Sequence, residues 1–120
     1  NKEHEVVDND YYKKAMIIME KEVLIDKIYV FSDDIDWCKE NMSFNHPVFF
    51  VDNSLSGQKG EGHMYLMSGC KNFIIPNSTF SWWGIWLSSN ENKKVVAPKI
   101  WSKDPYADVS DIILNEWIKI

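Results

Sequence analysis

Residues 72–87 read Asn-Phe-Ile-Ile-Pro-Asn-Ser-Thr-Phe-Ser-Trp-Trp-Gly-Ile-Trp-Leu, and this stretch decides the fold. It opens with a short apolar run typical of a buried strand, which Pro76 ends. Small polar residues follow, and an apolar run predicts a helix over Thr79–Ser89. A strand that leads through a short turn into a helix is the unit from which parallel α/β sheets are built.

The polar turn of this stretch places hydroxyl and backbone N–H groups where a helix begins. The first N–H groups of a helix lack intrahelical acceptors and the helix dipole is positive there, so a phosphate is readily held at such a turn. The alternative is that Ser78 or Thr79 only caps the helix. The turn taken alone leaves both interpretations open.

Strands and helices alternate along the whole chain, which predicts an α/β fold. We expect a doubly wound parallel sheet of about four strands with helices on both faces, formed by a single domain over residues 1–120. The first strand is continuously apolar, so we expect it to be buried on both faces. The predicted strands are Lys27–Phe31, Pro47–Val51, Asn72–Ile75 and Lys93–Pro98, and the predicted helices are Asp8–Val23, Ile35–Met42, His63–Cys70, Thr79–Ser89 and Asp108–Ile118.

Polar clusters follow three of the predicted strands. They are Ser32-Asp33-Asp34, Asp52-Asn53-Ser54 and Asn77-Ser78-Thr79. Each alone could be ordinary turn chemistry, but ligands of such sheets bind outside the carboxyl ends of the strands. Three clusters on one edge therefore favour a ligand site. Neither a GxGxxG nor a GxxxxGK[ST] motif is present, which disfavours a dinucleotide dehydrogenase and a P-loop kinase.

Charge and hydropathy narrow the choice of partners. The net charge of −5 disfavours a general affinity for nucleic acid or anionic lipid. All 13 basic residues are lysines, so a phosphate clamp must use lysine, hydroxyl or backbone N–H groups. No apolar run approaches the ~20 residues of a membrane span, and no signal peptide is visible. We expect a cytoplasmic protein, with peripheral association at the inner membrane as an alternative.

The sulfur and imidazole side chains show no metal-site spacing. Cys38 and Cys70 are expected to be free, buried thiols, although a disulfide between them is possible. His4, His46 and His63 are too scattered to predict a metal centre.

Two further sets of residues have a structural and a functional interpretation. Asp33 and Asp34 could form a paired acid/base site, but a helix cap is favoured because adjacent side chains point in different directions. Trp82, Trp83 and Trp86 could stack on a sugar, but their helical spacing favours the core. Trp101, in a predicted loop, is the better candidate for an aromatic residue facing an acceptor.

Three blocks of the sequence resemble a known family. Residues 31–39 (FSDDIDWCK), 64–71 (MYLMSGCK) and 74–84 (IIPNSTFSWWG) are similar to the C-terminal half of bacterial α-1,2-fucosyltransferases, glycosyltransferase family 11. The resemblance extends from about Tyr11 to Trp101. It implies the nucleotide-binding-like, donor-binding half of a GT-B type glycosyltransferase, which faces an N-terminal domain across a cleft. The implied reaction is an inverting, metal-independent transfer of fucose from GDP-fucose to the 2-hydroxyl of a galactose in a glycan acceptor, with no other cofactor.

The resemblance also assigns roles to residues. Ser78, Thr79 and Ser81 are implied to contact the diphosphate, beside Asn77 in the same turn. Asp34 and Asn53 are implied to line the donor side of the cleft. Asp52 accepts a hydrogen bond from ribose or base, or it is a turn residue.

Two positions, His63 and Asn72, depart from the family pattern, and an arginine motif of the family is missing. His63 stands where relatives carry an aspartate that reads guanine, and a neutral histidine has one acceptor for two guanine donors. Glu61 is near enough to substitute. A second family position holds Asn72 in place of a common histidine. The arginine motif of the N-terminal half is absent, since the chain has no arginine. We therefore assign no catalytic residue here, and keep a non-catalytic nucleotide-sugar-binding module and a purely structural domain as alternatives.

Overall fold

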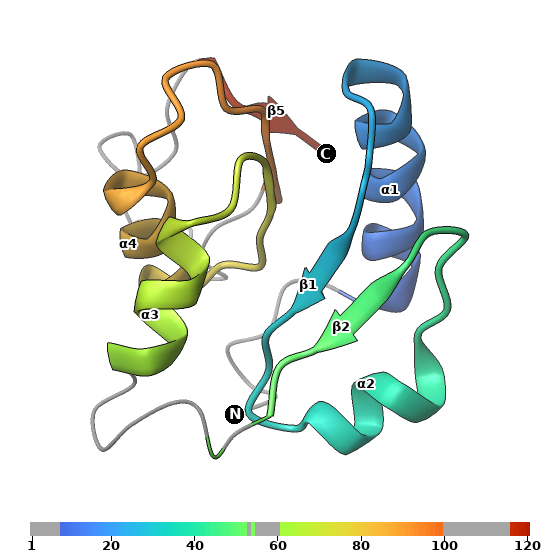
Figure 1. Cartoon of the computed structure of the whole chain (residues 1–120). Coiled ribbons are helices and arrows are strands. Elements are labelled where there is room, and N and C mark those ends of the chain that lie inside the picture. Colours follow the sequence, from blue (N-terminus) through green and yellow to red (C-terminus); the bar gives the residue numbers. More distant parts are fainter. Residues whose placement is uncertain (1–7, 53, 55–60, 100–115) are drawn as a thin grey trace, which may run out of the picture.

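The computed structural model describes residues 8–52, 54, 61–99 and 116–120 (Figure 1). Helices and strands alternate as the sequence predicts. The elements in chain order are α1 (Asn9–Glu22), β1 (Ile28–Val30), α2 (Ile35–Asn41), β2 (Val48–Phe50), α3 (Glu61–Ser68), β3 (Phe73–Ile74), α4 (Thr79–Leu87), β4 (Val95–Ala97) and β5 (Ile118–Lys119). No helix in these ranges is both long and apolar enough to span a membrane.

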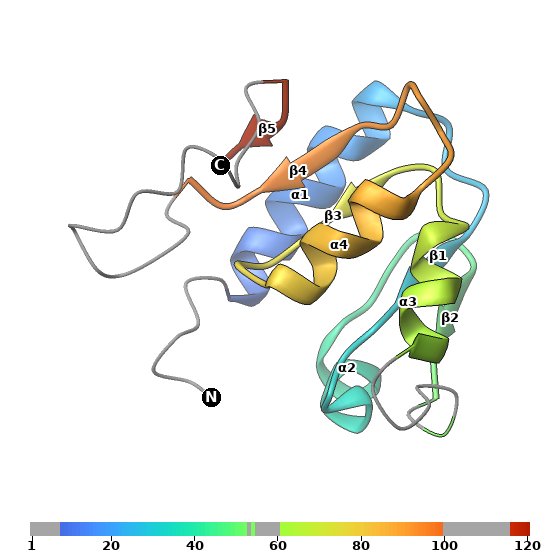
Figure 2. The same ribbon diagram turned by 90° about the vertical axis from the view of Figure 1, so that its left-hand side faces the viewer.

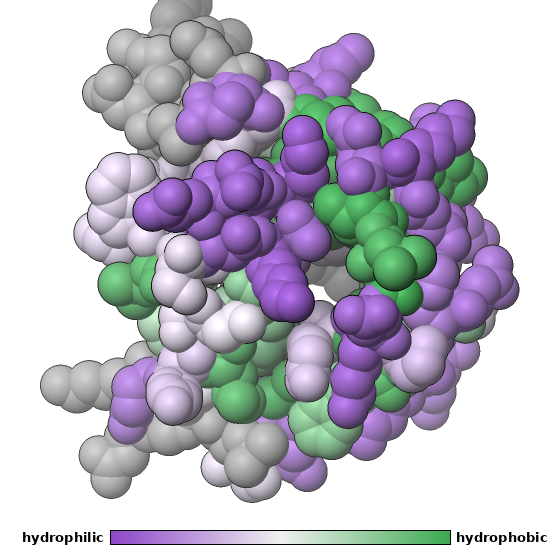
Figure 3. All heavy atoms as spheres, turned by 45° about the horizontal axis from the view of Figure 1, so that its top comes forward, coloured by the Kyte–Doolittle hydropathy of each residue, from purple (hydrophilic) through white to green (hydrophobic). Residues whose placement is uncertain are grey.

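The strands are all parallel, which confirms an α/β fold, but they form two sheets rather than one. β1 pairs with β2, while β3, β4 and β5 pair in that order. Each ladder is only two or three residues long, and within the described residues none joins β1 to β3. The predicted single sheet of about four strands is therefore divided. Figure 3, in which the top of Figure 1 comes forward, shows hydrophilic residues over much of that side of the molecule.

The chain ends in a strand where the sequence predicts a helix. Ile118 belongs to β5, so the predicted C-terminal end of the helix Asp108–Ile118 is wrong; residues 108–115 lie outside the described ranges. The physical reason is alternation of the side chains. Trp117 packs on one face of the sheet, and Ile118 and Ile120 pack on the other.

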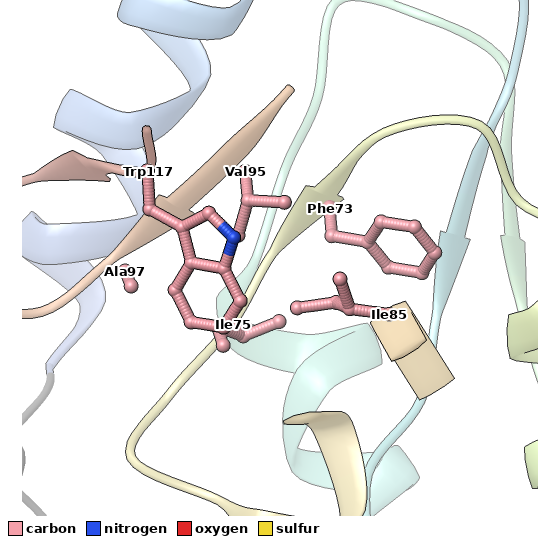
Figure 4. Close-up of a cluster of buried hydrophobic side chains, with 6 residues drawn as sticks. All are labelled: Phe73, Ile75, Ile85, Val95, Ala97 and Trp117. Carbon is pink, nitrogen blue, oxygen red and sulfur yellow. The ribbon is translucent and has the colours of Figure 1, made fainter. Parts of the chain in front are cut away.

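Helices lie on both faces of the three-stranded sheet. Figure 2 shows β3 and β4 between α4 and α1. On the α4 side a buried cluster joins both sheet and helix (Figure 4), and on the α1 side a second cluster contains Ala15, Met19 and Val96. The members of the first cluster are Phe73, Ile75, Ile85, Val95, Ala97 and Trp117.

The two-stranded sheet is covered less completely than the sequence predicts. Tyr29 and Phe49 lie opposite each other in the ladder, and both are exposed, so the prediction that β1 is buried on both faces is wrong. Their rings meet edge to face with centroids 6.1 Å apart. The Lys27 ammonium lies 5.3 Å and 5.5 Å from the two ring centroids. Ring contact and a cation over both rings stabilise this pair without burial by another element.

One hydroxyl joins α1 to the three-stranded sheet. Tyr11 is buried, and its hydroxyl reaches the carbonyl of Ile75 and lies 3.2 Å from the carbonyl of Val96. Burial raises the pKa of Tyr11 well above its ordinary value, with a smaller contribution from Tyr12. The hydroxyl is therefore protonated at neutral pH and acts as the donor.

Replacing Tyr11 by phenylalanine is expected to destabilise the fold. The Tyr11→Phe variant keeps the ring but removes the donor from a buried carbonyl, which costs about 1–2 kcal/mol of unfolding free energy. Urea denaturation measures the loss. Tyr29→Phe is the matched control, since Tyr29 is exposed, and it is expected to change stability by less than about 0.5 kcal/mol. Equal stability of Tyr11→Phe and the unmodified chain would contradict the assignment.

Candidate functional site

The start of α4 is a capped helix N-terminus. Ser78 is the N-cap, with extended backbone, and its Oγ accepts from the Ser81 N–H at 3.2 Å. The Ser78 carbonyl accepts from Trp82 N–H at 3.0 Å, and the Ser78 N–H donates to the Pro76 carbonyl at 2.9 Å. The structure thus gives the capping role to Ser78, and Thr79 is the first residue of the helix.

This cap does not use every donor at the helix start. By helix geometry the N–H groups of Thr79 and Phe80 have no intrahelical acceptor, and they point out of the N-terminus. Ser78 acts as an acceptor in the cap, so its O–H hydrogen is not used by that bond. Two backbone amides and one hydroxyl can therefore serve a negatively charged group at the positive end of the dipole.

Ser81 and Asn77, the other two residues predicted to contact the donor at this turn, have less exposed or already engaged side chains. Ser81 is buried, and its contribution to the turn is the backbone N–H that Ser78 caps. Asn77 is half-buried and already has an interaction partner. Donors at the surface of the turn thus come from the backbone more than from the serine and asparagine side chains.

The carboxyl end of β1 leads into a second helix cap. The Asp34 Oδ1 accepts from the Trp37 N–H at 3.3 Å and caps α2, and the Asp34 N–H donates to Ser32 Oγ at 3.0 Å. This bond pattern confirms the cap interpretation of the Asp33-Asp34 pair. Asp34 remains exposed at the strand edge where the sequence predicts a donor site.

Asp52, just after β2, forms a turn with Ser54. Its Oδ1 accepts from the Ser54 N–H at 2.8 Å, which is the turn alternative considered from the sequence. Hydrogen bonds from the backbone and side chain of Ser54 lower the pKa of Asp52, so the exposed carboxylate is ionised at neutral pH. Asn53, also predicted to line the donor side, lies outside the described residues.

His63 links α3 to the ends of both strands of the smaller sheet. The side chain is only 7% exposed, and its Nε2 lies 3.2 Å from the Asp52 carbonyl oxygen. A carbonyl only accepts, so Nε2 carries the hydrogen. The ring also meets Phe31 edge to face, with centroids 5.6 Å apart. In the neutral form Nδ1 is then the single acceptor left on the ring.

α3 connects the predicted residues at the ends of β1 and β2 with those at the start of α4. Its first turns hold His63 against the β1–β2 end, and its later turns pack on α4. The contact with α4 is close, because a Cβ placed on Gly84 would lie 3.1 Å from Met67 Cβ. The Asp34, Asp52 and His63 group is thus held relative to the α4 start by one short helix.

Lys93 and Asn72 each fix the end of an element through hydrogen bonds, and Lys93 was missed in the sequence. Lys93 Nζ donates to the carbonyls of Ile85 (2.9 Å) and Ser88 (3.0 Å) at the end of α4. A lysine shortly after a helix is the signal that could have found it. Asn72 Oδ1 accepts from Lys94 N–H at 2.9 Å and so aligns the starts of β3 and β4.

The tryptophans of α4 do not form the core that their spacing predicts. Trp82 is half-buried, but Trp83 and Trp86 are 50% and 61% exposed. The prediction is therefore wrong for two of the three. The reason is that α4 is apolar all round, while only one side of a helix can pack on the sheet and α3. Trp101 lies outside the described residues.

The two thiols are both free. Cys38 is a free, buried thiol, and Cys70 is a free, half-buried thiol whose pKa is raised by burial. Across the described ranges, no group of three or more His, Cys, Asp or Glu side chains is arranged to hold a metal ion.

Comparison with known proteins shows the family. The profile described as "Glycosyl transferase family 11" matches residues 1–120. The chain belongs to this family. It is 41% identical over 120 residues to the O-antigen biosynthesis glycosyltransferase WbnK of Escherichia coli. This alignment covers 100% of the chain and 39% of WbnK. It is 38% identical over 96 residues to an alpha-1,2-colitosyltransferase of Escherichia coli, covering 77% of the chain and 32% of that protein.

The chain spans less than two fifths of the length of these relatives. No solved structure matches the chain significantly. Within the described residues, the ends of β1 and β2 and the start of α4 are the candidate ligand contacts of this chain.

The N-cap of α4 is expected to contribute measurably to stability. Ser78→Ala removes the acceptor for the Ser81 N–H and should lower the unfolding free energy by about 1 kcal/mol, whereas Ser78→Asp keeps an acceptor and should retain most of it. Thermal and urea unfolding of both variants measure the difference. The assignment fails if the alanine and aspartate variants are equally destabilised.

His63 is expected to stabilise the fold through its bond to Asp52. His63→Ala should cost about 2 kcal/mol because it leaves a cavity and an unpaired carbonyl. His63→Gln keeps an N–H donor and should recover part of the loss, as measured by urea denaturation. His46→Gln serves as the control, since His46 makes only an exposed contact with Glu20. Identical losses for Ala and Gln would show that the hydrogen bond contributes nothing.

Proposed function

We propose that this chain is the donor-binding part of an inverting α-1,2-fucosyltransferase of the GT-B type. In this proposal GDP-fucose binds at the carboxyl ends of the strands, and fucose passes to the 2-hydroxyl of a galactose in a glycan acceptor. An N-terminal domain outside the chain supplies the other wall of the cleft and the group that deprotonates the acceptor. The observation that carries the proposal is the α4 start in a chain of glycosyltransferase family 11: Ser78 caps the Ser81 N–H, and by helix geometry the amides of Thr79 and Phe80 have no intrahelical acceptor.

The chemistry required of the α4 start is the stabilisation of charge. When the bond between fucose and the diphosphate breaks, negative charge grows on the leaving GDP. The amides of Thr79 and Phe80 and the positive dipole end would hold that charge, and a preorganised helix end reorganises little as the charge develops. The Thr79 hydroxyl is proposed as a further donor to the diphosphate. The chain has no arginine, so no guanidinium group within it shares this role.

The nucleobase contacts are proposed at the β1–β2 end. Asp52 is ionised and exposed, so it can accept from ribose hydroxyls or from the base. His63 is engaged with the Asp52 carbonyl and offers one acceptor, so guanine recognition would need a second acceptor such as Glu61. Asp34 and Asn53 complete the proposed donor wall.

The transferred sugar has a second candidate. One relative is named as an alpha-1,2-colitosyltransferase, so a colitosyl donor is the alternative to a fucosyl donor in this chain. The 1,2 linkage is common to that name and to the proposed reaction.

Calorimetric titration with GDP tests the donor site. We expect GDP to bind more tightly than UDP or ADP, and Thr79→Ala to weaken GDP binding roughly tenfold, which corresponds to about 1.4 kcal/mol for one hydrogen bond to a charged group. Ser43→Ala, in an exposed segment remote from α4, is the control and should bind GDP as the unmodified chain does.

Other outcomes of this titration would redirect the proposal. Equal binding of all three nucleotides would remove guanine recognition and leave only a diphosphate site. No binding of any nucleotide would contradict donor binding by this chain. A longer protein that contains this chain and an N-terminal domain separates the transferase from a non-catalytic nucleotide-sugar-binding module. Binding of GDP by that protein without release of GDP from GDP-fucose in the presence of a galactoside would favour the binding module.

A further inference from the structure

The backbone that follows β2 has few contacts to hold it in place. The last ladder bond of the smaller sheet runs from the Val51 N–H to the Val30 carbonyl at 2.9 Å. Asp52, the next residue, makes no backbone–backbone hydrogen bond within the part of the chain that the structure describes. Its side chain bonds to Ser54, only two residues along, which shapes the turn but does not fix it to another element.

His63 supplies the contact that fixes this turn to the rest of the protein. Its Nε2 donates to the Asp52 carbonyl at 3.2 Å, and its ring meets that of Phe31, the residue after β1. The side chain that makes both contacts is only 7% exposed. His63 therefore joins the ends of β1 and β2 and holds the backbone that carries the Asp52 carboxylate.

α3 in turn holds His63 in place. Met67 lies one helical turn after His63 on the same side of α3, and both side chains are buried. Met67 lies against Gly84 of α4, where a Cβ on the glycine would be 3.1 Å from the Met67 Cβ. The position of the Asp52 turn is thus linked through α3 to α4, the helix whose start is the proposed diphosphate site.

The Asp52 carboxylate is a hydrogen-bond acceptor at the surface. It is exposed, and its bonds with Ser54 lower its pKa, so it is ionised at neutral pH. A carboxylate has about four acceptor positions, so the bonds with Ser54 leave capacity for a ligand. The matching groups on a nucleotide-sugar donor are the O–H groups of the ribose and the N–H groups of the base.

We propose that His63 is a positioning residue of the donor site: by holding the Asp52 backbone, it places the Asp52 carboxylate to accept from the O–H or N–H groups of the donor nucleoside. This inference rests on the proposed function and adds a role for His63 within it. A direct reading of the nucleoside by the ring is less favoured, because Nε2 is engaged and little of the ring is exposed. A purely structural role predicts a different response of Asp52 to changes at His63.

An NMR titration of the Asp52 carboxyl carbon tests the positioning without a ligand. His63→Phe keeps a ring beside Phe31 but removes the N–H, so the turn should loosen. The pKa of Asp52 should then rise toward its ordinary value, because the bonds with Ser54 lower it. His63→Gln keeps an N–H donor and should restore the low pKa. An unchanged Asp52 pKa in His63→Phe would overturn the proposal.

His46→Phe is the matched control for this titration. His46 precedes β2, at the opposite end of the strand from Asp52, and its ring contacts Glu20 of α1. The same histidine-to-phenylalanine change there should leave the Asp52 pKa where it is in the unmodified chain. An equal rise of the Asp52 pKa in His46→Phe would contradict a specific effect of His63.

Calorimetric titration with GDP tests what the positioning serves. His63→Phe and Asp52→Ala should each weaken GDP binding roughly tenfold, as expected for the loss of one hydrogen bond to a charged group. The double variant should be no weaker than Asp52→Ala alone, because both changes remove the same contact. Pyrophosphate, which has no nucleoside, should bind all variants equally. Additive losses of GDP affinity, or a parallel loss of pyrophosphate affinity, would overturn the proposal.

Two donor analogues identify the group that Asp52 accepts from. The loss of affinity caused by His63→Phe should vanish with 2′,3′-dideoxy-GDP if the partner is the ribose, and with ADP if the partner is the N–H edge of guanine. A loss that persists with both analogues would overturn the nucleoside contact. An unmodified chain that does not bind GDP would contradict the proposed function, whereas GDP binding with an unaltered Asp52 pKa in His63→Phe contradicts the positioning role alone.

Discussion

The position of α1 on the larger sheet depends on the hydrogen bonding of the Tyr11 hydroxyl. The carbonyls of Ile75 and Val96 both lie within reach of this hydroxyl. The Val96 carbonyl also accepts from the Ile75 N–H at 3.0 Å, so the loss of a donor would fall mainly on the buried Ile75 carbonyl, where it is costly. Tyr11 supplies the donor from α1 and so fixes that helix on the sheet. Ile75 immediately precedes the turn that starts α4. The same contact thus positions the backbone amides that are proposed to hold the donor diphosphate.

Side-chain caps then set the direction of each helix that begins at a strand end. Asp34 caps α2 and Ser78 caps α4, and in both cases the capping residue comes from a polar cluster at the carboxyl end of a strand. Capping and ligand binding are compatible, because a cap uses one of the free amides and leaves others. The question posed by the sequence, whether Ser78 caps a helix or serves a ligand, is therefore not a choice between exclusive roles.

Local patterns in the sequence predicted the elements well because strands and helices here follow from local chemistry. Apolar runs located β1 to β4, and carboxylate or hydroxyl residues located the starts of α2 and α4. Local patterns did not predict which strands pair with each other, and they did not predict which apolar side chains are exposed. The separation of β1 from β3 depends on ladders only two or three residues long. The exposure of Tyr29 and of Trp86 depends on what covers each face, which no local pattern contains.

α4 can pack on the rest of the protein and still offer its N-terminus to a donor, because the two roles use different parts of the helix. The proposed diphosphate site uses the first turn, where the amides of Thr79 and Phe80 point along the helix axis. Packing uses groups that project sideways from later turns: Ile85 lies in the core cluster with β3 and β4, and Gly84 lies against Met67 of α3. The contacts that hold the helix in place therefore do not compete with a donor for the amides of the first turn.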